Sequence, residues 1–359
     1  MPEISVRNAD FSDIPSILEL VRIIGRYVSF EDELFSWMAL DPQAVVIAES
    51  SQSKQIVGAC SGMAYGPGRG FMGLYMVREE YRGRGIGTQL WNKAMKHLED
   101  RNIGVRGLES MFSEYRDKRG FLHQPDYVIC YYKCSESSLI SPKLNLDSFG
   151  IVSLVGKGVW PGKPELVANI RDLKSNLAES TTECTLRDIK ISYLDTVENI
   201  IVQERKDTME SGRSVENLLT EVVSYDRLLH GYDRSFIVAQ TLSWRSCKTK
   251  IAIINEKVVG YICLRPTVVG FWMISPFYAD SEDIAELLLF SVLSDVNFSE
   301  ITDGIEIRFP DKNPYCLKLI QKYGFRDESL PISTGYNKTC IEVDVSRIYS
   351  FHATIFCTE

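Results

Sequence analysis

The sequence of 359 residues has no apolar run long enough for a membrane-spanning helix and no excess of positive charge. Such a helix needs about 20 mostly apolar residues. The chain begins Met-Pro-Glu-Ile-Ser, without the basic stretch and apolar core of a secretory leader. We therefore expect a cytoplasmic protein with no membrane partner. The formal net charge of -8 also argues against nucleic acid, whose phosphates are bound by clustered Lys and Arg.

Histidine is scarce, and the cysteines show no metal-ligand spacing. The four histidines form no pattern with Ser, Cys or acidic residues that would suggest a hydrolase triad. Cys130 and Cys134 lie close together, but no second Cys or His pair follows at zinc spacing. The nine cysteines are odd in number and mostly embedded in apolar segments, which is typical of reduced, buried thiols. The sequence therefore predicts no metal site.

The composition does provide apolar material for folded domains. Hydrophobic residues make up 45% of the chain and charged residues 25%. This balance is typical of globular proteins and not of disordered chains. Since one hydrophobic core rarely grows beyond about 250–300 residues, two domains are expected.

A weak internal repeat divides the chain into two halves of similar plan. A strand followed by a helix is predicted from Ser5, with Asp13 as the helix cap, and Arg7 in this segment matches Arg187 in the second half. Gly70-Phe71 and Gly270-Phe271 follow in the same order. A polar stretch precedes the second repeat. We therefore expect a first domain over residues 1–180, with its core at 3–134, and a second over 181–359.

The segment most informative about chemistry is a glycine-rich turn between a strand and a helix. The apolar run Phe71–Val77 predicts a buried strand, and apolar residues return at helical spacing from Thr88 onward. Backbone N–H groups and the positive end of a helix dipole meet in such a turn, and glycine lets phosphate oxygens approach the main chain. The turn therefore predicts a pyrophosphate site, in which Arg82 and Arg84 add positive charge.

The sequence Arg82-Gly-Arg-Gly85-Ile-Gly87 resembles the Arg/Gln-x-x-Gly-x-Gly/Ala signature of the GNAT superfamily of N-acetyltransferases. The resemblance covers roughly residues 3–134. It implies an α/β fold of two tandem GNAT-like domains, each with a central mixed, mostly antiparallel sheet flanked by helices. It also implies acetyl-CoA as cosubstrate, bound by Met76, Val77, Arg82, Gly83, Arg84, Gly85, Ile86, Gly87 and Thr88.

The second half resembles a degenerate GNAT domain. Matching Met76 with Met273 places Asp280 opposite Gly83 and Glu282 opposite Gly85. Side chains and negative charge at these positions would oppose a pyrophosphate. We therefore expect the second half to keep the fold without the cofactor, and the chain to bind one acetyl-CoA.

Acetyl transfer to an amine needs a deprotonated nucleophile, a donor to the oxyanion and a proton for the departing thiolate. The family often takes that proton from a Tyr before a Gly-Phe pair, which implies Tyr115 here, with packing of its ring as the alternative. Glu109 is the candidate general base, and Tyr75 or a water chain is the alternative. The resemblance implies the main-chain N–H of Val77 as the oxyanion donor.

The sequence thus predicts an acyltransferase that moves acetyl from acetyl-CoA to an amine of a small molecule or peptide by direct attack. The alternative is a non-catalytic CoA-binding sensor or scaffold, which the lack of a carboxylate in the strand Phe71–Val77 would favour. Two polar groups of the second half, Tyr232-Asp-Arg234 and Asn313-Pro-Tyr-Cys, are candidates to line a substrate pocket, although salt bridges explain the first equally well.

Overall fold

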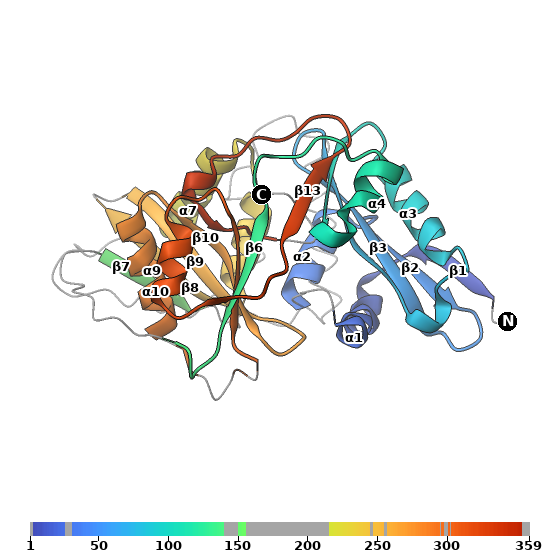
Figure 1. The fold of residues 1–359 in the computed structure, drawn as a ribbon, viewed down its shortest axis with the longest axis horizontal. Coiled ribbons are helices and arrows are strands. Elements are labelled where there is room, and N and C mark those ends of the chain that lie inside the picture. Colours follow the sequence, from blue (N-terminus) through green and yellow to red (C-terminus); the bar gives the residue numbers. More distant parts are fainter. Residues whose placement is uncertain are drawn as a thin grey trace. The chain divides into compact units, whose positions relative to one another are not determined.

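The chain divides into two compact units (Figure 1). The first comprises Met1–Pro142, Pro266–Tyr278 and Asn297–Glu359, and the second Lys143–Arg265 and Ala279–Val296. The computed structural model describes residues 3–25, 31–139, 150–155, 215–244, 247–254, 257–294, 296–297, 301 and 303–353. The expected domain boundary at residue 180 lies outside the described residues.

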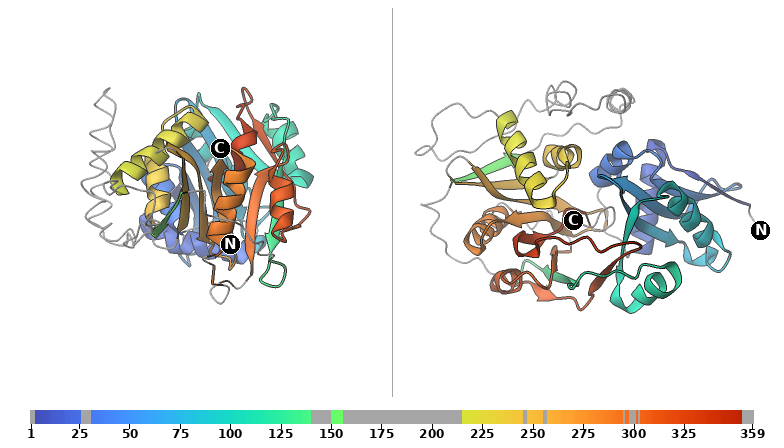
Figure 2. Two further views of the ribbon diagram at one scale, coloured as in Figure 1. Left: turned by 90° about the vertical axis from the view of Figure 1, so that its left-hand side faces the viewer. Right: turned by 90° about the horizontal axis from the view of Figure 1, so that it is seen from above.

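The first half of the chain forms a mixed sheet with helices on both faces. Figure 2 shows α1 and α2 on one face of this sheet and α3 and α4 on the other. Strands β1 to β4 are antiparallel neighbours, and β5 runs parallel to β4. The elements are β1 (Ile4–Asn8), η1 (Phe11–Asp13), α1 (Ile14–Ile24), α2 (Glu31–Leu40), β2 (Val45–Ser50), β3 (Ile56–Tyr65), β4 (Arg69–Val77), η2 (Glu79–Tyr81), α3 (Ile86–His97), β5 (Asn102–Leu108), α4 (Glu109–Arg119) and β6 (Ile129–Cys134).

Helix α3 packs closely on β3 because two positions of that strand are glycine. A Cβ on Gly62 would lie 2.6 Å from the carbonyl oxygen of Ala94, and one on Gly58 would lie 3.0 Å from the side chain of Leu90. Leu90 and Ala94 belong to the buried core beneath the helix. This tight contact fixes the position of the N-terminus of α3, where the glycine-rich turn ends.

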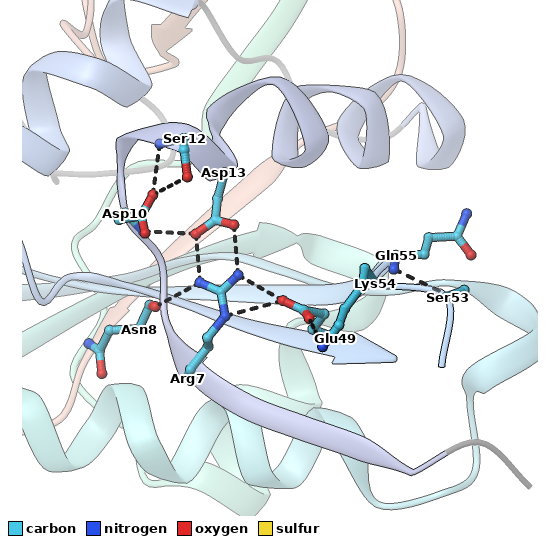
Figure 3. A network of polar contacts seen from close by, with 9 residues as sticks. All are labelled: Arg7, Asn8, Asp10, Ser12, Asp13, Glu49, Ser53, Lys54 and Gln55. Atoms are coloured by element: carbon cyan, nitrogen blue, oxygen red, sulfur yellow. Dashed lines mark hydrogen bonds and ion pairs between the residues drawn. The ribbon is translucent and has the colours of Figure 1, made fainter. Parts of the chain in front are cut away.

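A network of charged side chains joins β1 to β2 and η1 (Figure 3). The guanidinium of Arg7 donates to both carboxylate oxygens of Asp13, at 2.7 and 2.8 Å, and to Glu49 at 2.7 Å. Asp13 occupies the N-cap position of α1 as predicted, but its side chain makes no cap hydrogen bond there. The carboxylate instead accepts hydrogen bonds from Arg7, which gives the arginine at position 7 of β1 a structural role. Its repeat partner, Arg187, lies outside the described residues.

The two halves of the chain exchange strands within the first unit. In the second half β10 runs parallel to β11, as β4 does to β5. However, β6 of the first half pairs with β11, and β13 of the second half pairs with β5. Each half therefore supplies a strand to the sheet of the other. The second half contributes to this unit β10 (Trp272–Ala279), β11 (Ile305–Pro310), α10 (Cys316–Lys322), β12 (Arg326–Asp327), β13 (Ile332–Tyr336), η5 (Val345–Arg347) and β14 (Ile348–Ser350).

The second unit contains an antiparallel sheet in the order β9-β8-β7. Its buried polar centre is Asp226, which accepts a hydrogen bond from the Tyr261 hydroxyl at 2.7 Å and pairs with Nε of Arg234 at 3.1 Å. Arg234 thus belongs to a buried ion pair, so this residue of the Tyr232-Asp-Arg234 group has a structural role. The elements are β7 (Gly150–Val155), α7 (Val215–His230), α8 (Ser235–Ser243), β8 (Lys248–Ile254), β9 (Lys257–Pro266) and α9 (Glu282–Ser294).

The predicted fold class is confirmed. The structure is a mixed α/β fold with helices flanking the sheet. Apart from the β4–β5 and β10–β11 pairs, the strand pairs whose register is described are antiparallel. The strand exchange was not part of the prediction, because hydrophobic patterning identifies a strand but not its distant partner.

Candidate active site

The pairing between strands β4 and β5 covers only the first half of β4. Their parallel pairing ends at Met72, opposite Val105, although β4 continues to Val77. Leu74 lies just beyond this point with a φ of +48°, and the register between β3 and β4 shifts by one residue there. A leucine in this left-handed region is strained, and such strain often marks a functional site. From Gly73 to Val77, β4 is therefore not paired with β5, and we call this unpaired part of the two strands the β4–β5 split.

One backbone donor of β4 points into this split. The N–H of Arg78 donates to the carbonyl of Val57 on β3, at 2.8 Å. Successive N–H groups of an extended chain point to opposite sides. The N–H of Val77 therefore points away from β3 and towards the side on which β5 would have paired.

The glycine-rich turn follows directly and is exposed to solvent from Arg82 to Gly85. Gly83 and Gly85 both have a φ of +74°, and a Cβ on either would meet no atom within 4 Å. These two glycines are required by backbone conformation, and they leave open space above the main chain. The turn can therefore take a ligand in direct contact with its backbone.

Both arginines of the turn are held by backbone carbonyls. Nε of Arg82 donates to the carbonyl of Val77 at 3.1 Å, which places its guanidinium at the end of β4. Arg84 donates to the carbonyl of Glu80 at 2.7 Å and lies 5.0 Å from the ring centroid of Tyr81. Two exposed cations thus flank the turn, and their charge favours a polyanion such as a pyrophosphate.

Helix α3 begins at Ile86 with Gly85 as its N-cap, and no side chain caps it. The first N–H groups of a helix have no partner within the helix and carry its positive partial charge. The side chain of Ile86 is buried in the core, as is that of Met76, so these two residues offer a ligand only their main chain. Thr88 lies exposed on the first turn of the helix. The arrangement is that of an anion site.

The third glycine of the turn has a different role. A Cβ on Gly87 would lie 2.5 Å from the hydroxyl oxygen of Tyr75, which comes from the end of β4 beyond the bulge. Glycine at this position therefore lets the Tyr75 side chain lie against the first turn of α3. This contact joins the β4–β5 split to the anion site.

Tyr75 belongs to an aromatic group under the turn. Its ring meets Trp91 of α3 edge-on at 5.4 Å between centroids, and Tyr115 of α4 stacks on the same Trp91 at 5.7 Å. Arg119 lies 4.7 Å above the Trp91 ring. Gly107 makes room for Tyr115, because a Cβ there would lie 2.8 Å from its ring. The structure thus brings Tyr115 and Tyr75 to one place beside the split.

Both phenols of this group are held in the protonated form. Burial raises the pKa of Tyr115 to about 12, and burial also raises the pKa of Tyr75. A phenol with a raised pKa is a proton donor at neutral pH and a poor base. Burial therefore leaves both phenols able to donate a hydrogen bond at neutral pH but makes them weaker acids than an exposed tyrosine.

Glu109, the candidate base, begins the helix that carries Tyr115. It is the first residue of α4, is exposed, and its N–H donates to the carbonyl of Pro331 at 2.9 Å. Among the described residues no hydrogen bond or ion pair joins its carboxylate to Tyr115 or to the turn.

Sequence reasoning did not single out Trp91, Arg119 or the strained Leu74. Trp91 is one of the apolar residues that predict a helix from Thr88 onward, and a helical pattern does not reveal which strand residue will contact it. Nothing in the sequence indicates the positive φ of Leu74, because leucine rarely adopts the left-handed conformation.

The part of the chain that the structure describes contains no group of three or more His, Cys, Asp or Glu side chains that could hold a metal ion. The described helices also include none that is long and apolar enough to span a membrane.

Two family models match the chain. The acetyltransferase (GNAT) family matches residues 14–118, and an acetyltransferase (GNAT) domain matches residues 222–350. The first match contains the whole β4–β5 split, the turn and α3. The second contains β8 to β11 and β14, which confirms that both halves are GNAT domains.

Solved structures show the same fold. A putative acetyltransferase from Pyrococcus horikoshii is 16% identical, with a TM-score of 0.64 over 99% of this chain and 96% of that chain. A tandem GNAT protein from the clavulanic acid biosynthesis pathway is 14% identical, with a TM-score of 0.54 over 94% of this chain and 100% of that chain.

A relative is also found by sequence. An uncharacterized protein of Caenorhabditis elegans is 32% identical over 84 residues, which are 23% of this chain and 27% of that protein. The chain thus spans about a quarter of this curated relative.

Proposed function

Since the chain belongs to the GNAT acetyltransferase family and carries two GNAT domains in tandem, we propose that it transfers acetyl from acetyl-CoA to an amine. The acceptor is an amine of a small molecule or a peptide, and it attacks the thioester directly. The reaction takes place at the β4–β5 split of the first half.

One observation carries this proposal: β4 leaves β5 at Met72 and leads, through the turn, into the uncapped N-terminus of α3. The pyrophosphate of acetyl-CoA would bind the N–H groups of residues 83–88 and the charge of Arg82 and Arg84. The pantetheine arm carries amide groups along an extended chain, as a peptide does. It would therefore lie along β4 from Gly73 to Val77, in the place of a missing strand.

This placement brings the thioester to the groups that the reaction needs. The N–H of Val77 points into the split and is the proposed donor to the oxyanion that forms at the thioester carbonyl oxygen when the amine attacks the carbon. Tyr115 is the proposed donor of the proton to the departing thiolate, since it keeps its proton at neutral pH and stacks on the same Trp91 that Tyr75 contacts. Tyr75 lies against the same Trp91 and is the second phenol within this group.

The amine must lose its proton before or during attack. We propose Glu109 as the group that takes up this proton, through water, since its carboxylate is exposed to solvent at the first residue of α4. The excess of acidic residues, with a net charge of -8, favours the approach of cationic amines. An attacking amine must be neutral, so the rate should rise with pH as more of the acceptor is unprotonated.

A free-thiol assay tests the proposal. Acetyl-CoA is supplied with a panel of amines that includes polyamines, arylalkylamines and Lys-containing peptides, and release of CoA thiol is followed. We expect amine-dependent release from the wild-type protein and none from Gly85→Glu. A CoA-binding sensor would bind acetyl-CoA in the same experiment but release no thiol with any acceptor.

A further inference from the structure

The second half contains a split of the same kind as the first. Strand β10 pairs in parallel with β11 only as far as Ile274, opposite Ile307, although β10 continues to Ala279. Met72 and Val105 are the corresponding last pair of the first half. Both halves thus part their two parallel strands halfway along the first of them.

In the second half this place is filled by a strand of the chain itself. Beyond Ile274, β10 pairs antiparallel with β14, where Phe277 is opposite Ser350 and Tyr278 is opposite Ile348. β14 also contacts β11, so it lies between the two parted strands. The Ser350 hydroxyl donates to the carbonyl of Ile274 at 2.8 Å, at the point where the pairing with β11 ends.

β14 is fixed firmly in this position from its N-terminal side. The side-chain amide of Asn313 donates to the carbonyls of Val345 and Ile348, each at 3.0 Å, and to that of Ser346 at 3.2 Å. Asn313, which the sequence suggested as a pocket residue, is therefore a clamp on the segment that leads into β14. Ile348, Tyr349 and Ser350 are all buried.

The segment after β14 is fixed as well. The hydroxyl of Ser275 donates to the carbonyls of Phe351 and His352 at 2.9 and 2.6 Å. Arg106 on β5 donates to the carbonyl of Ala353 at 3.1 Å and lies 4.5 Å from the ring centroid of Phe351. The strand is thus held at both ends by side chains of the fold.

Unlike the split, the anion site of the first half has no counterpart between β10 and α9 of the second half. Residues 78–85 connect β4 to α3, whereas only Asp280 and Ser281 connect β10 to α9. The alignment that placed Asp280 opposite Gly83 is therefore replaced, because the whole glycine-rich turn is missing. Glu282 and Asp283 occupy the first turn of α9, and their negative charge opposes an anion at this helix terminus.

We propose that β14 is a built-in peptide occupant of the β10–β11 split, in the place that the pantetheine arm takes in the first half. This inference rests on the proposed function for the identity of the first ligand. A peptide strand and a pantetheine arm both present amide groups to a strand edge, so one split can receive either. The second half is thus a closed copy of the cofactor site, and the chain has one site for acetyl-CoA.

Titration calorimetry and hydrogen exchange test the proposal on the full chain. We expect one acetyl-CoA per wild-type chain and no binding by Gly85→Glu, because β14 already fills the split of the second half. Amide exchange at Ile348–Ser350 should be slow in the free protein and unchanged by acetyl-CoA, whereas exchange in the turn of residues 82–88 should slow.

Two bound molecules per chain, or binding by a folded Gly85→Glu variant with altered exchange at β10 or β14, would overturn the proposal. Fast exchange at Ile348–Ser350 in the free protein would also overturn it. That last result is independent of the cofactor. If the wild-type chain binds no acetyl-CoA while β14 stays protected, the proposed function fails but the closure of the second split stands.

Discussion

The hydroxyl of Tyr75 lies where a side chain on residue 87 would have to be, 2.5 Å from the position of its Cβ. Tyr75 comes from the end of β4, and Gly87 from the first turn of α3. The contact therefore sets the distance between the strand that would hold the pantetheine arm and the helix terminus that would hold the pyrophosphate. A change on either side should move one binding element relative to the other.

Gly87→Ala should weaken acetyl-CoA binding by displacing the first turn of α3. Forcing a methyl group into a packed position costs about 1–3 kcal/mol. If binding needs the wild-type position of the turn, that cost lowers the affinity by about 5- to 150-fold. Tyr75→Phe in the same chain removes the clashing oxygen and should recover much of that loss. Calorimetry on the two single variants and the double variant measures this rescue. Equal affinity of Gly87→Ala and the wild-type chain would show that the contact does not position the turn.

Gly85→Glu should abolish acetyl-CoA binding while the protein stays folded. The substitution puts a side chain and a negative charge on the exposed backbone that faces the phosphates. Gly68→Glu is the matched control, because Gly68 has a φ of +65° and open space around it but lies in the turn between β3 and β4. Calorimetry should show binding by the control alone. Unchanged binding by a folded Gly85→Glu variant would refute the assignment of the turn.

Tyr115→Phe should lower kcat by about 100-fold, the usual contribution of general acid catalysis, with little change in acetyl-CoA affinity. The ring and its stacking on Trp91 are kept, so packing stays constant. The raised pKa, about 12, also means that wild-type kcat should not fall through loss of this proton between pH 8 and about 10. A pH profile of both proteins tests this. Wild-type kcat in the Phe variant would make Tyr115 a packing residue and would direct attention to Tyr75.

The stability of the first half should depend on pH through Glu49. Its hydrogen bonds from Arg7 hold the pKa of Glu49 below its ordinary value of 4.5. A lowered pKa in the folded state stabilises the fold above the ordinary pKa, and this contribution is lost as the pH falls through the lowered value. Glu49→Gln should therefore be less stable than the wild type at pH 7, and the difference should shrink below pH 4. Urea unfolding at both pH values measures it, and a difference independent of pH would rule the ion pair out as its source.

A fragment that ends at residue 139 should not form the first half's sheet. It contains β1 to β6 but lacks β13, which pairs with β5 from Ile332 to Tyr336, and β11, which pairs with β6. Both β5 and β6 would then expose unpaired edges. Circular dichroism and hydrogen exchange on the fragment are expected to show a poorly ordered chain. A fragment with native-like exchange protection at β5 would show that the strand exchange is dispensable.

The features that sequence predicted correctly are local ones. The run Phe71–Val77, the glycines at 83 and 85 and the apolar face of α3 lie next to one another in the chain, so their spacing alone indicates strand, turn and helix. Gly87 was grouped with the other two glycines, although its neighbour in the structure is Tyr75. Only the fold shows that one glycine serves packing and two serve backbone conformation.

The features that sequence did not predict depend on distant partners. The pairing of β13 with β5 joins residues more than 200 positions apart, and the insertion of β14 beside β10 joins Ser350 to Phe277. An alternating or apolar segment indicates a strand but does not identify the strand that will pair with it. Counting from the Met76 and Met273 match misplaced Asp280 and Glu282 for a related reason. The connection after β10 is shorter than the one after β4, and a count from one fixed point does not show this difference.

Transfer of the acetyl group is the central claim, and mass spectrometry of the acceptor measures it most directly. Acetyl-CoA with an isotope label in its acetyl group is incubated with an amine accepted in the thiol assay and with the wild-type, Gly85→Glu or Gly68→Glu chain. The account predicts a labelled N-acetyl product with the wild-type and Gly68→Glu chains and none with Gly85→Glu. A labelled product from a folded Gly85→Glu chain, or no labelled product from the wild-type chain with any amine of the panel, would contradict it.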